Sequence, residues 1–572
     1  MSLAGCNAAT VTGRWLEEVV WRIGTIATEP WLVIARRGMM RRGCACVPRL
    51  GWIPVHGMLC MTRVHFIAAS LGGLLLSACS SADVGAPSGV GVTISNERVT
   101  VNPSGFAPLT AVIHVETSAP TKISLTVPGK HGAASDVAKD FDDVGTTHDI
   151  PVLGLYADVE NAVQCIYRDA GGAEVSRKTY VIRTAQLPAG TFPAIAIETR
   201  KDGQLVAGMT LVSYFGYQLT SFPQTPFIFD AYGDIRWYLD YRLSVPLGSL
   251  FFDDGVARLQ NGNLYFGDVK SNAIYEVDML GRIVDSWPLP GFQFHHNVQE
   301  KPNGNFLVTV TKQGISTTED FIIELDRATR QVVRTWDLRA SLQAGRLAMT
   351  TDAVDWIHVN AVTYDASDNT IIVSGRTQAL VKLDANNRVV WILGAHKGWG
   401  TAGNGTALGQ FLLQPVDRND QPITDQRVLD GDAIHPDFEW QWYQHAPLVM
   451  PSGHVLLFDN GGDNRNFSGR GQYSRAAEYA ISATKKTVKQ VWTYGKDRGA
   501  SIFSNIVSNV EYLAASNHLI VSPGAANTGT KYGKVIEMDY ATQEVVFEAT
   551  LTPPQTYFGI TFHRTHRLSL YP

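Results

Sequence analysis

A repeat in residues 196–572 limits the possible folds more than any other feature of this sequence. Each copy runs from a polar turn into a strand-like segment that ends in an aromatic residue, as in EVDMLGRIVDSW and KLDANNRVVWIL. Units of about 40 to 50 residues with four short strands are typical of β-propeller blades. The copies end at Trp237, Trp287, Trp336, Trp391, Trp492 and Phe547, at intervals of 50, 49, 55, 101 and 55 residues. Six such marks predict a six-bladed β-propeller over residues 196–572.

The long interval between Trp391 and Trp492 leaves room for a seventh blade. Residues 394–443 within it are, however, rich in Gly, Asp, Gln and Pro. Long connections in a compact domain are usually functional loops. We therefore interpret residues 394–443 as an insertion that forms a lid over the mouth of the propeller channel.

Residues 91–195 precede the repeat and have a different pattern. Short alternations of apolar and polar residues, such as LTAVIHVET and KISLTV, are separated by turns, which is typical of half-buried strands. This pattern favours a small sandwich. The predicted fold class is therefore all-β, with a six-bladed β-propeller preceded by a small immunoglobulin-like β-sandwich domain.

The composition supports a folded protein and excludes one class of partner. Hydrophobic residues make up 45% and charged residues 18% of the 572 residues, as in ordinary globular proteins. The formal net charge is −5. Because nucleic-acid-binding domains carry an excess of basic residues, no nucleic-acid partner is expected.

The N-terminal region has the pattern of an export signal. Residues 61–79 combine a basic start, an apolar run and the sequence LSAC, which together are typical of a bacterial lipoprotein signal peptide. Cys79 would then carry the lipid, and Ser80 beside it favours the outer membrane. Residues 1–60 are expected to lie upstream of the true start, and residues 80–90 to form a linker. The predicted location is periplasmic and lipid-anchored; a plain signal peptide and a signal anchor are the alternatives.

Three segments place histidines at or beside the start of apolar, β-rich runs in three different copies of the repeat. They are FHHNV at residues 294–298, DWIHVN at 355–360 and QHAPL at 444–448. Equivalent loops of a circular repeat fold meet near its axis, so these histidines could form one cluster. Most of the 15 histidines in such a chain are structural or exposed, and the three segments alone leave open whether any is catalytic.

These segments resemble the motifs of one enzyme family. DWIHVNAVTYD, IIVSGRTQALVKLD and WYQHAPLVMPSGHVLLFDNG, followed by Arg465, occur in this order. They are similar to bacterial aryl-sulfate sulfotransferases that need no nucleotide sulfate donor, and the resemblance extends from about residue 92 to the C-terminus. It implies a six-bladed propeller with an N-terminal β-sandwich, no cofactor and no metal. The implied partners are an aryl sulfate donor and a phenolic acceptor, and the family also includes homodimers.

Matched position by position, the resemblance implies roles for five residues. His445 would accept the sulfuryl group, with His296, His358 and Arg376 as catalytic neighbours and with Asn360 and Arg376 binding the substrate. A neutral imidazole is a competent nucleophile, and the arginine fork suits two sulfuryl oxygens. The expected reaction is a ping-pong transfer from a phenolic sulfate ester to a phenolic acceptor, through a covalent sulfohistidine on His445.

Two interpretations without turnover remain open on the residues alone. Converging histidines are also good ligands for Zn²⁺ or Cu²⁺, as in a metal- or ligand-binding propeller lipoprotein. An arginine in the cluster and the scarcity of carboxylates in the motifs argue against a cation. A propeller used as an assembly scaffold gives no reason for His-x-Asn and Arg at neighbouring blade positions.

Overall fold

A computed structural model gives the fold of the chain from residue 91 onwards. The expectations for residues 1–90, with Cys79, lie outside the described residues, and so does Arg465. Nearly all regular structure in the described part is β-strand, which confirms the all-β class. Within the same part, no helix has the length and apolar character needed to cross a membrane. The described residues are 91–572 except 214, 218–223, 252–254, 347–349, 463–472, 528–530 and 555–558.

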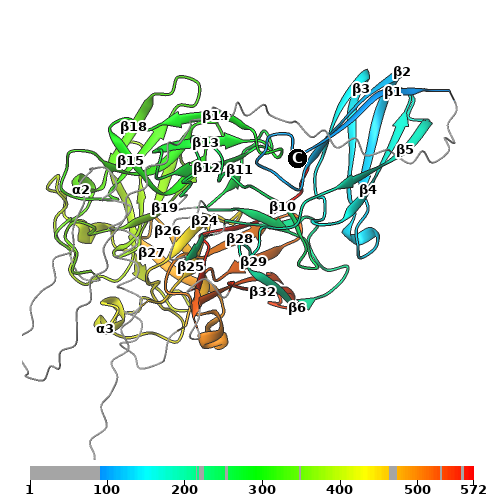
Figure 1. Cartoon of the computed structure of the whole chain (residues 1–572). Helices are drawn as coiled ribbons and strands as arrows, with labels where there is room; N and C mark the ends of the chain where they lie inside the picture. Colours follow the sequence, from blue (N-terminus) through cyan, green and yellow to red (C-terminus); the bar gives the residue numbers. More distant parts are fainter. Residues whose placement is uncertain are drawn as a thin grey trace, which may run out of the picture. The chain divides into compact units, whose positions relative to one another are not determined.

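The first five strands form the β-sandwich region, coloured blue and cyan in Figure 1. Its central strand β2 alternates buried and partly exposed residues, as the sequence pattern predicted. The inward side chains of β2, among them Ile113 and Leu125, pack against Val163 of the neighbouring strand in one apolar core. The strands are β1 (Ile94–Val101), β2 (Ala111–Val127), β3 (Val137–Val152), β4 (Glu160–Arg168) and β5 (Glu174–Arg183).

Six further sheets follow, and they are the blades of a propeller (Figure 1). The ring is closed at two places. The last strand, β34 (Thr565–Leu568), pairs with β7 (Met209–Val212) in the first blade, whereas β6 (Ala194–Arg200) pairs with β32 (Val545–Thr552) in the last. Because both ends of the repeat region are paired into the ring, the fold leaves neither end as an open edge. The six-bladed prediction is confirmed.

The inner strands of successive blades are β34, β11, β15, β19, β24 and β28. The first blade also contains β7, β9 (Phe227–Phe229) and β10 (Ile235–Tyr238), and the second is β11 (Ala257–Arg258), β12 (Leu264–Asp268), β13 (Ala273–Val277) and β14 (Ile283–Pro288). The third is β15 (Phe292–Glu300), β16 (Phe306–Lys312), β17 (Phe321–Leu325) and β18 (Val332–Asp337), and the fourth is β19 (Val359–Asp365), β20 (Thr370–Gly375), β21 (Ala379–Leu383) and β22 (Val389–Leu393). The fifth contains β24 (His445–Val449), β25 (Val455–Asp459), β26 (Arg475–Ser482) and β27 (Thr487–Tyr494), and the sixth contains β28 (Asn509–Leu513), β29 (His518–Ser522), β31 (Lys531–Asp539), β32 and β6.

Four of the six aromatic residues that mark the repeat join one blade to the next. Trp237 lies in the outer strand of the first blade, and its indole N–H donates to the carbonyl oxygen of Met279 in the second blade at 2.7 Å. The same bond recurs from Trp287 to Arg327 at 2.9 Å. It occurs again from Trp336 to Asp384 and from Trp492 to Tyr540. The spacing of these residues therefore reflects a repeated contact between neighbouring blades.

The insertion at residues 394–443 does not form a seventh blade. It contains β23 (Gln414–Pro415), the short helix α3 (Gln426–Leu429) and the 3-10 turn at Leu408–Phe411. β23 pairs in parallel with β27 at the outer edge of the fifth blade. Trp440 is 2% exposed and belongs to an apolar core shared by the fourth and fifth blades. Parts of the insertion therefore pack against the fourth and fifth blades, and its role as a lid stays a prediction.

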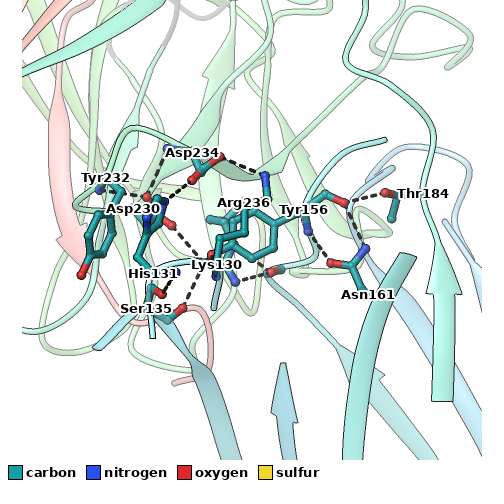
Figure 2. Close-up of polar contacts among 11 residues, drawn as sticks. Lys130, His131, Ser135, Tyr156, Asn161, Thr184, Asp230, Tyr232, Asp234 and Arg236 are labelled. Atoms are coloured by element: carbon teal, nitrogen blue, oxygen red, sulfur yellow. Dashed lines mark hydrogen bonds and ion pairs between the residues drawn. The ribbon is translucent and has the colours of Figure 1, made fainter. Parts of the chain in front are cut away.

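A buried arginine connects the β-sandwich to the first blade (Figure 2). The Arg236 side chain is fully buried and donates to the carbonyl oxygens of Gly154 and Ser135 and to the Tyr156 hydroxyl. Its charge is balanced by Asp230 at 3.0 Å. Further contacts in Figure 2 join Lys130 and His131 to Asp234. The sandwich is thus tied to the propeller by directional polar contacts as well as by apolar packing.

Candidate functional site

Three inner strands are irregular where the sequence places its histidine segments. The pairing register shifts within β15, β19 and β24 at these segments. His296 and His358 have positive φ angles of 54° and 49°, and Ala446, directly after His445, has φ of 47°. This conformation costs a non-glycine residue about 1 to 2 kcal/mol, and bulges of this kind re-aim side chains near functional sites. At these positions in three successive blades, the strained backbone turns the histidine side chains away from the regular alternation between the two faces of a strand.

The structure brings together four of the residues singled out from the sequence. The Nε2 atoms of His296 and His358 lie 3.0 Å apart. Arg376, which follows β20, places Nη1 3.3 Å from Nε2 of His358. Burial lowers the pKa of His445 well below its usual value, and the charges of Arg376 and of the other two histidines lower it further. Each of the three histidines is at most 6% exposed.

The hydrogen bonds assign the protons of His358 and His296. Arginine can only donate, so Nε2 of His358, which contacts Arg376, must accept. Its proton is therefore on Nδ1, which faces the Asp355 carboxylate at 2.6 Å. The one lone pair on Nε2 of His358 is then shared by two donors, Arg376 and His296, so Nε2 of His296 carries the hydrogen in the bond between the two rings. His296 thus keeps a proton on the nitrogen that faces the cluster.

The environment of His445 assigns its tautomer in the same way. Nδ1 lies 3.0 Å from the carbonyl oxygen of Tyr443 and 2.7 Å from Oδ1 of Asn460. The amide nitrogen of Asn460 donates to the carbonyl oxygens of Ser504 and Val507, which fixes Oδ1 toward the histidine. Both neighbours of Nδ1 are acceptors, so Nδ1 carries the proton. The lone pair of neutral His445 is therefore on Nε2.

Asn360 lies beside the cluster and is bonded to the neighbouring blade. Its Nδ2 donates to the carbonyl oxygen of Gln444 at 2.8 Å, which joins β19 to β24 next to His445. Its Oδ1 is buried and has no hydrogen-bond partner among the described residues. One blade earlier, Oδ1 of Asn297 accepts from the backbone of Val362 at 2.8 Å. These asparagines set the spacing of the inner strands that carry the histidines.

Two carboxylates at the cluster were missed from the sequence. Oε2 of Glu319 lies 3.0 Å from Nδ1 of His358 and 3.4 Å from Nε2 of His296. Burial raises the pKa of Glu319, and the charge of Asp355 raises it further. Asp355 lies in the DWIHVN motif, three residues before His358, and this spacing could have revealed it. Glu319 lies before β17 in a segment without a motif. The scarcity of carboxylates in the motifs does not extend to the cluster, so it gives no argument against a cation there.

A fourth histidine also approaches the cluster. His563 lies two residues before β34, and its ring centroid is 5.9 Å from that of His296. Burial lowers the pKa of His563 well below its usual value, and the charge of His296 adds to this effect. The segment FHRTHRL begins the last inner strand much as FHHNV begins β15, and this likeness is the signal that could have identified His563.

Two sets of side chains have the spacing of metal ligands. They are His295, His296 and Glu319, and Glu319, Asp355 and His358; within each set the ligand atoms lie within 4.8 Å of one another. His295 is 2% exposed, and neither of its ring nitrogens has a side-chain hydrogen-bond partner in the described part of the chain. The other four side chains already pair with one another. Arg376, in contact with His358, opposes a cation.

Comparisons with known proteins point to one family. Residues 195–558 match the profile described as arylsulfotransferase (ASST), and residues 98–185 match the arylsulfotransferase Ig-like domain, which confirms the immunoglobulin-like character of the sandwich. The arylsulfate sulfotransferase AssT of Escherichia coli O6:H1 is 28% identical, over 82% of this chain and 93% of the relative. AssT of Lelliottia amnigena is 27% identical, over 80% and 91% respectively.

Among solved structures, a virginiamycin B lyase from Staphylococcus aureus matches with 10% identity and a TM-score of 0.26. The match covers 62% of this chain and 98% of the lyase, and at this TM-score it carries no argument. The family profile alone spans well over half of the 572 residues. The chain therefore belongs to the arylsulfotransferase family.

Proposed function

We propose that the protein moves a sulfuryl group from a phenolic sulfate ester to a phenolic acceptor by a ping-pong mechanism, with a covalent sulfohistidine on His445 as the intermediate. The observation that carries the proposal is the state of His445. Its Nδ1 faces two acceptors, and burial keeps its pKa low, so a neutral ring presents a lone pair on Nε2. A nucleophile in this state needs no additional base.

In the first half-reaction, Nε2 of His445 attacks sulfur while the bond from sulfur to the phenolic oxygen breaks. The transition state should resemble that of phosphoryl transfer, with charge spread over three oxygens. Arg376 offers a charged fork to two of these oxygens, and its position against His358 brings that fork into the cluster. Loss of one such preorganised donor typically lowers turnover by about 10² to 10³.

The departing phenolate needs a proton. His296 carries one on Nε2, by the hydrogen-bond assignment above, and we assign it as the general acid, acting from its imidazolium form. In the second half-reaction the acceptor phenol returns a proton to His296 while its oxygen attacks sulfur. The bond between sulfur and Nε2 of His445 then breaks and restores the neutral ring. Each half-reaction balances without a metal or a nucleotide.

The test is phenol release from a chromogenic aryl sulfate, with and without an added phenol acceptor, on protein lacking residues 1–79. His445→Ala should release no phenol in either condition. His454→Ala is a matched control, because His454 lies in the same blade and pairs with Glu478 outside the cluster. Acceptor-dependent release by wild type and by this control supports the proposal. Release that ignores the acceptor would indicate a sulfatase.

A second candidate function, a metal-binding propeller without turnover, is favoured by one observation. The buried His295 has no side-chain hydrogen-bond partner in the described part of the chain and has ligand spacing to His296 and Glu319. Elemental analysis of the purified protein tests it. A stoichiometric metal together with no transfer activity would replace the sulfotransferase proposal.

Export and lipid attachment at Cys79, periplasmic location at the outer membrane and homodimer formation are proposals that rest on the sequence and its resemblance. Labelling with a fatty-acid probe in wild type and in Cys79→Ser tests the anchor, and sedimentation of the protein without residues 1–79 tests the dimer.

A further inference from the structure

We propose that Glu319 is a positioning residue for sulfuryl transfer. Its carboxylate stabilises the imidazolium form of His296, so that His296 can protonate the departing phenolic oxygen. The inference rests on the proposed function and deepens it, since it names the group that prepares the acid for the reaction.

The backbone of Glu319 is fixed at the boundary between the third and fourth blades. Its N–H donates to Oγ1 of Thr311 in β16 at 2.9 Å, and its carbonyl oxygen accepts from the N–H of Val359 at 3.1 Å. Val359 directly follows His358. Glu319 also has a positive φ of 55°, and the residue is 1% exposed. A strained backbone that is anchored on two blades indicates that the position of this carboxylate is functionally constrained.

The chemistry of the cluster requires a negative charge beside His296. A neutral imidazole cannot act as a general acid by losing its one proton, so the imidazolium must form. Burial opposes that charge, and so does the guanidinium of Arg376, which lies against His358. Oε2 of Glu319 is 3.4 Å from Nε2 of His296 and is the carboxylate oxygen that offsets both effects.

The two carboxylates, Asp355 and Glu319, act on different histidines. Asp355 accepts a hydrogen bond from Nδ1 of His358 at 2.6 Å, which keeps the proton on Nδ1 and leaves Nε2 of His358 as an acceptor. Glu319 contacts both rings and is far more buried than Asp355, whose side chain is 29% exposed. Removal of Asp355 should therefore disturb the orientation of His358. Removal of Glu319 should disturb the charge of His296.

Glu319 itself transfers no proton. As the sulfur–oxygen bond of the donor breaks, its electron pair goes to the phenolic oxygen, and the proton of His296 moves to that oxygen. His296 is then neutral until the acceptor phenol returns a proton in the second half-reaction. Glu319 keeps the same charge throughout the cycle, which distinguishes a positioning residue from a catalytic one.

The dependence on leaving group tests this assignment. A phenol that is a poor leaving group needs protonation, whereas 4-nitrophenolate leaves without it. Glu319→Gln should lower kcat/KM for phenyl sulfate by about 10² to 10³, within the range of general acid catalysis, and that for 4-nitrophenyl sulfate by less than about tenfold. The matched control is Glu324→Gln: Glu324 is also buried in the same blade and pairs with Lys301 away from the histidines. It should affect both substrates equally.

Four outcomes decide the matter. Equal losses on both substrates in Glu319→Gln would overturn the inference while leaving sulfotransfer intact. No transfer by wild type would overturn the proposed function and the inference with it. A metal bound by wild type and lost in Glu319→Gln would make Glu319 a ligand instead. If Glu319→Gln does not fold, Glu319→Asp replaces it, because the shorter side chain moves the carboxylate away from His296. This variant should show an intermediate preference for the substrate with the better leaving group. The absence of any preference would contradict the inference.

Discussion

Asn460 offers the sharpest quantitative test of how the nucleophile is held. Asn460→Ala removes the 2.7 Å bond to Nδ1 of His445 and the bonds to the carbonyl oxygens of Ser504 and Val507 at 2.8 and 3.0 Å. A net hydrogen bond contributes about 1 kcal/mol, and a buried carbonyl that loses its partner costs about 1 to 3 kcal/mol. Because the Ser504 carbonyl also accepts from another hydroxyl, the expected loss is about 2 to 4 kcal/mol in the free energy of unfolding.

The effect on catalysis should be smaller, because the carbonyl oxygen of Tyr443 still accepts from Nδ1 of His445 at 3.0 Å. The tautomer survives and only its orientation weakens, so we expect kcat/KM to fall about fivefold to tenfold, equivalent to roughly 1 kcal/mol. Urea denaturation and single-turnover phenol release measure the two effects. Asn509→Ala is the control, since buried Asn509 of the sixth blade makes similar bonds to Thr565 of the first blade. Wild-type turnover in Asn460→Ala, or a loss as complete as that of His445→Ala, would refute the reasoning.

Three further predictions concern charge. Arg376→Lys keeps the positive charge that lowers the pKa of His445 but loses the bidentate fork. Turnover should therefore fall about 10² to 10³, and the acidic limb of the pH–rate profile should not move. Arg376→Gln also removes the charge, so it should raise the pKa of His445 and move that limb to higher pH. Burial lowers the pKa of His295, His445 and His563 well below the usual value, so the unfolded state binds more protons below about pH 6.5. Each of these histidines then contributes a loss of stability of up to about 1.4 kcal/mol per pH unit as the pH falls, and the raised pKa of Glu319 opposes part of this loss. Urea denaturation at several pH values measures this slope, and a flat profile would contradict it. Arg236→Met should cost about 3 to 5 kcal/mol in urea denaturation because it leaves a buried carboxylate unpaired, with turnover of the folded protein kept.

The fold could be predicted because its repeat is carried by a few large residues. Tryptophans such as Trp237 and Trp336 each make the same contact with the next blade, so their spacing in the sequence is the spacing of the blades. The insertion was recognised by its composition. The packing of the insertion could not be predicted, because β23 pairs with β27, about 70 residues away, and such a pairing leaves no local pattern in the sequence.

The site was only partly predictable for a similar reason. The motifs identified His296, His358 and His445, but the sequence did not say which of His295 and His296 faces the cluster. The contact of His296 with His358 decides this, and the positive φ of His296 that accompanies it depends on the surrounding sheet, not on local propensity. Glu319 was missed because a single glutamate before a strand resembles any other until the fold brings it to the histidines.

The most direct test of the central claim is mass spectrometry of the protein during turnover. Protein lacking residues 1–79 is mixed with an aryl sulfate in the absence of acceptor, quenched and digested. The account predicts one sulfuryl group per chain, located on the peptide that contains His445, absent from His445→Ala and removed when a phenol is added. Acceptor-dependent transfer by a protein that never carries a sulfuryl group on His445 would contradict it.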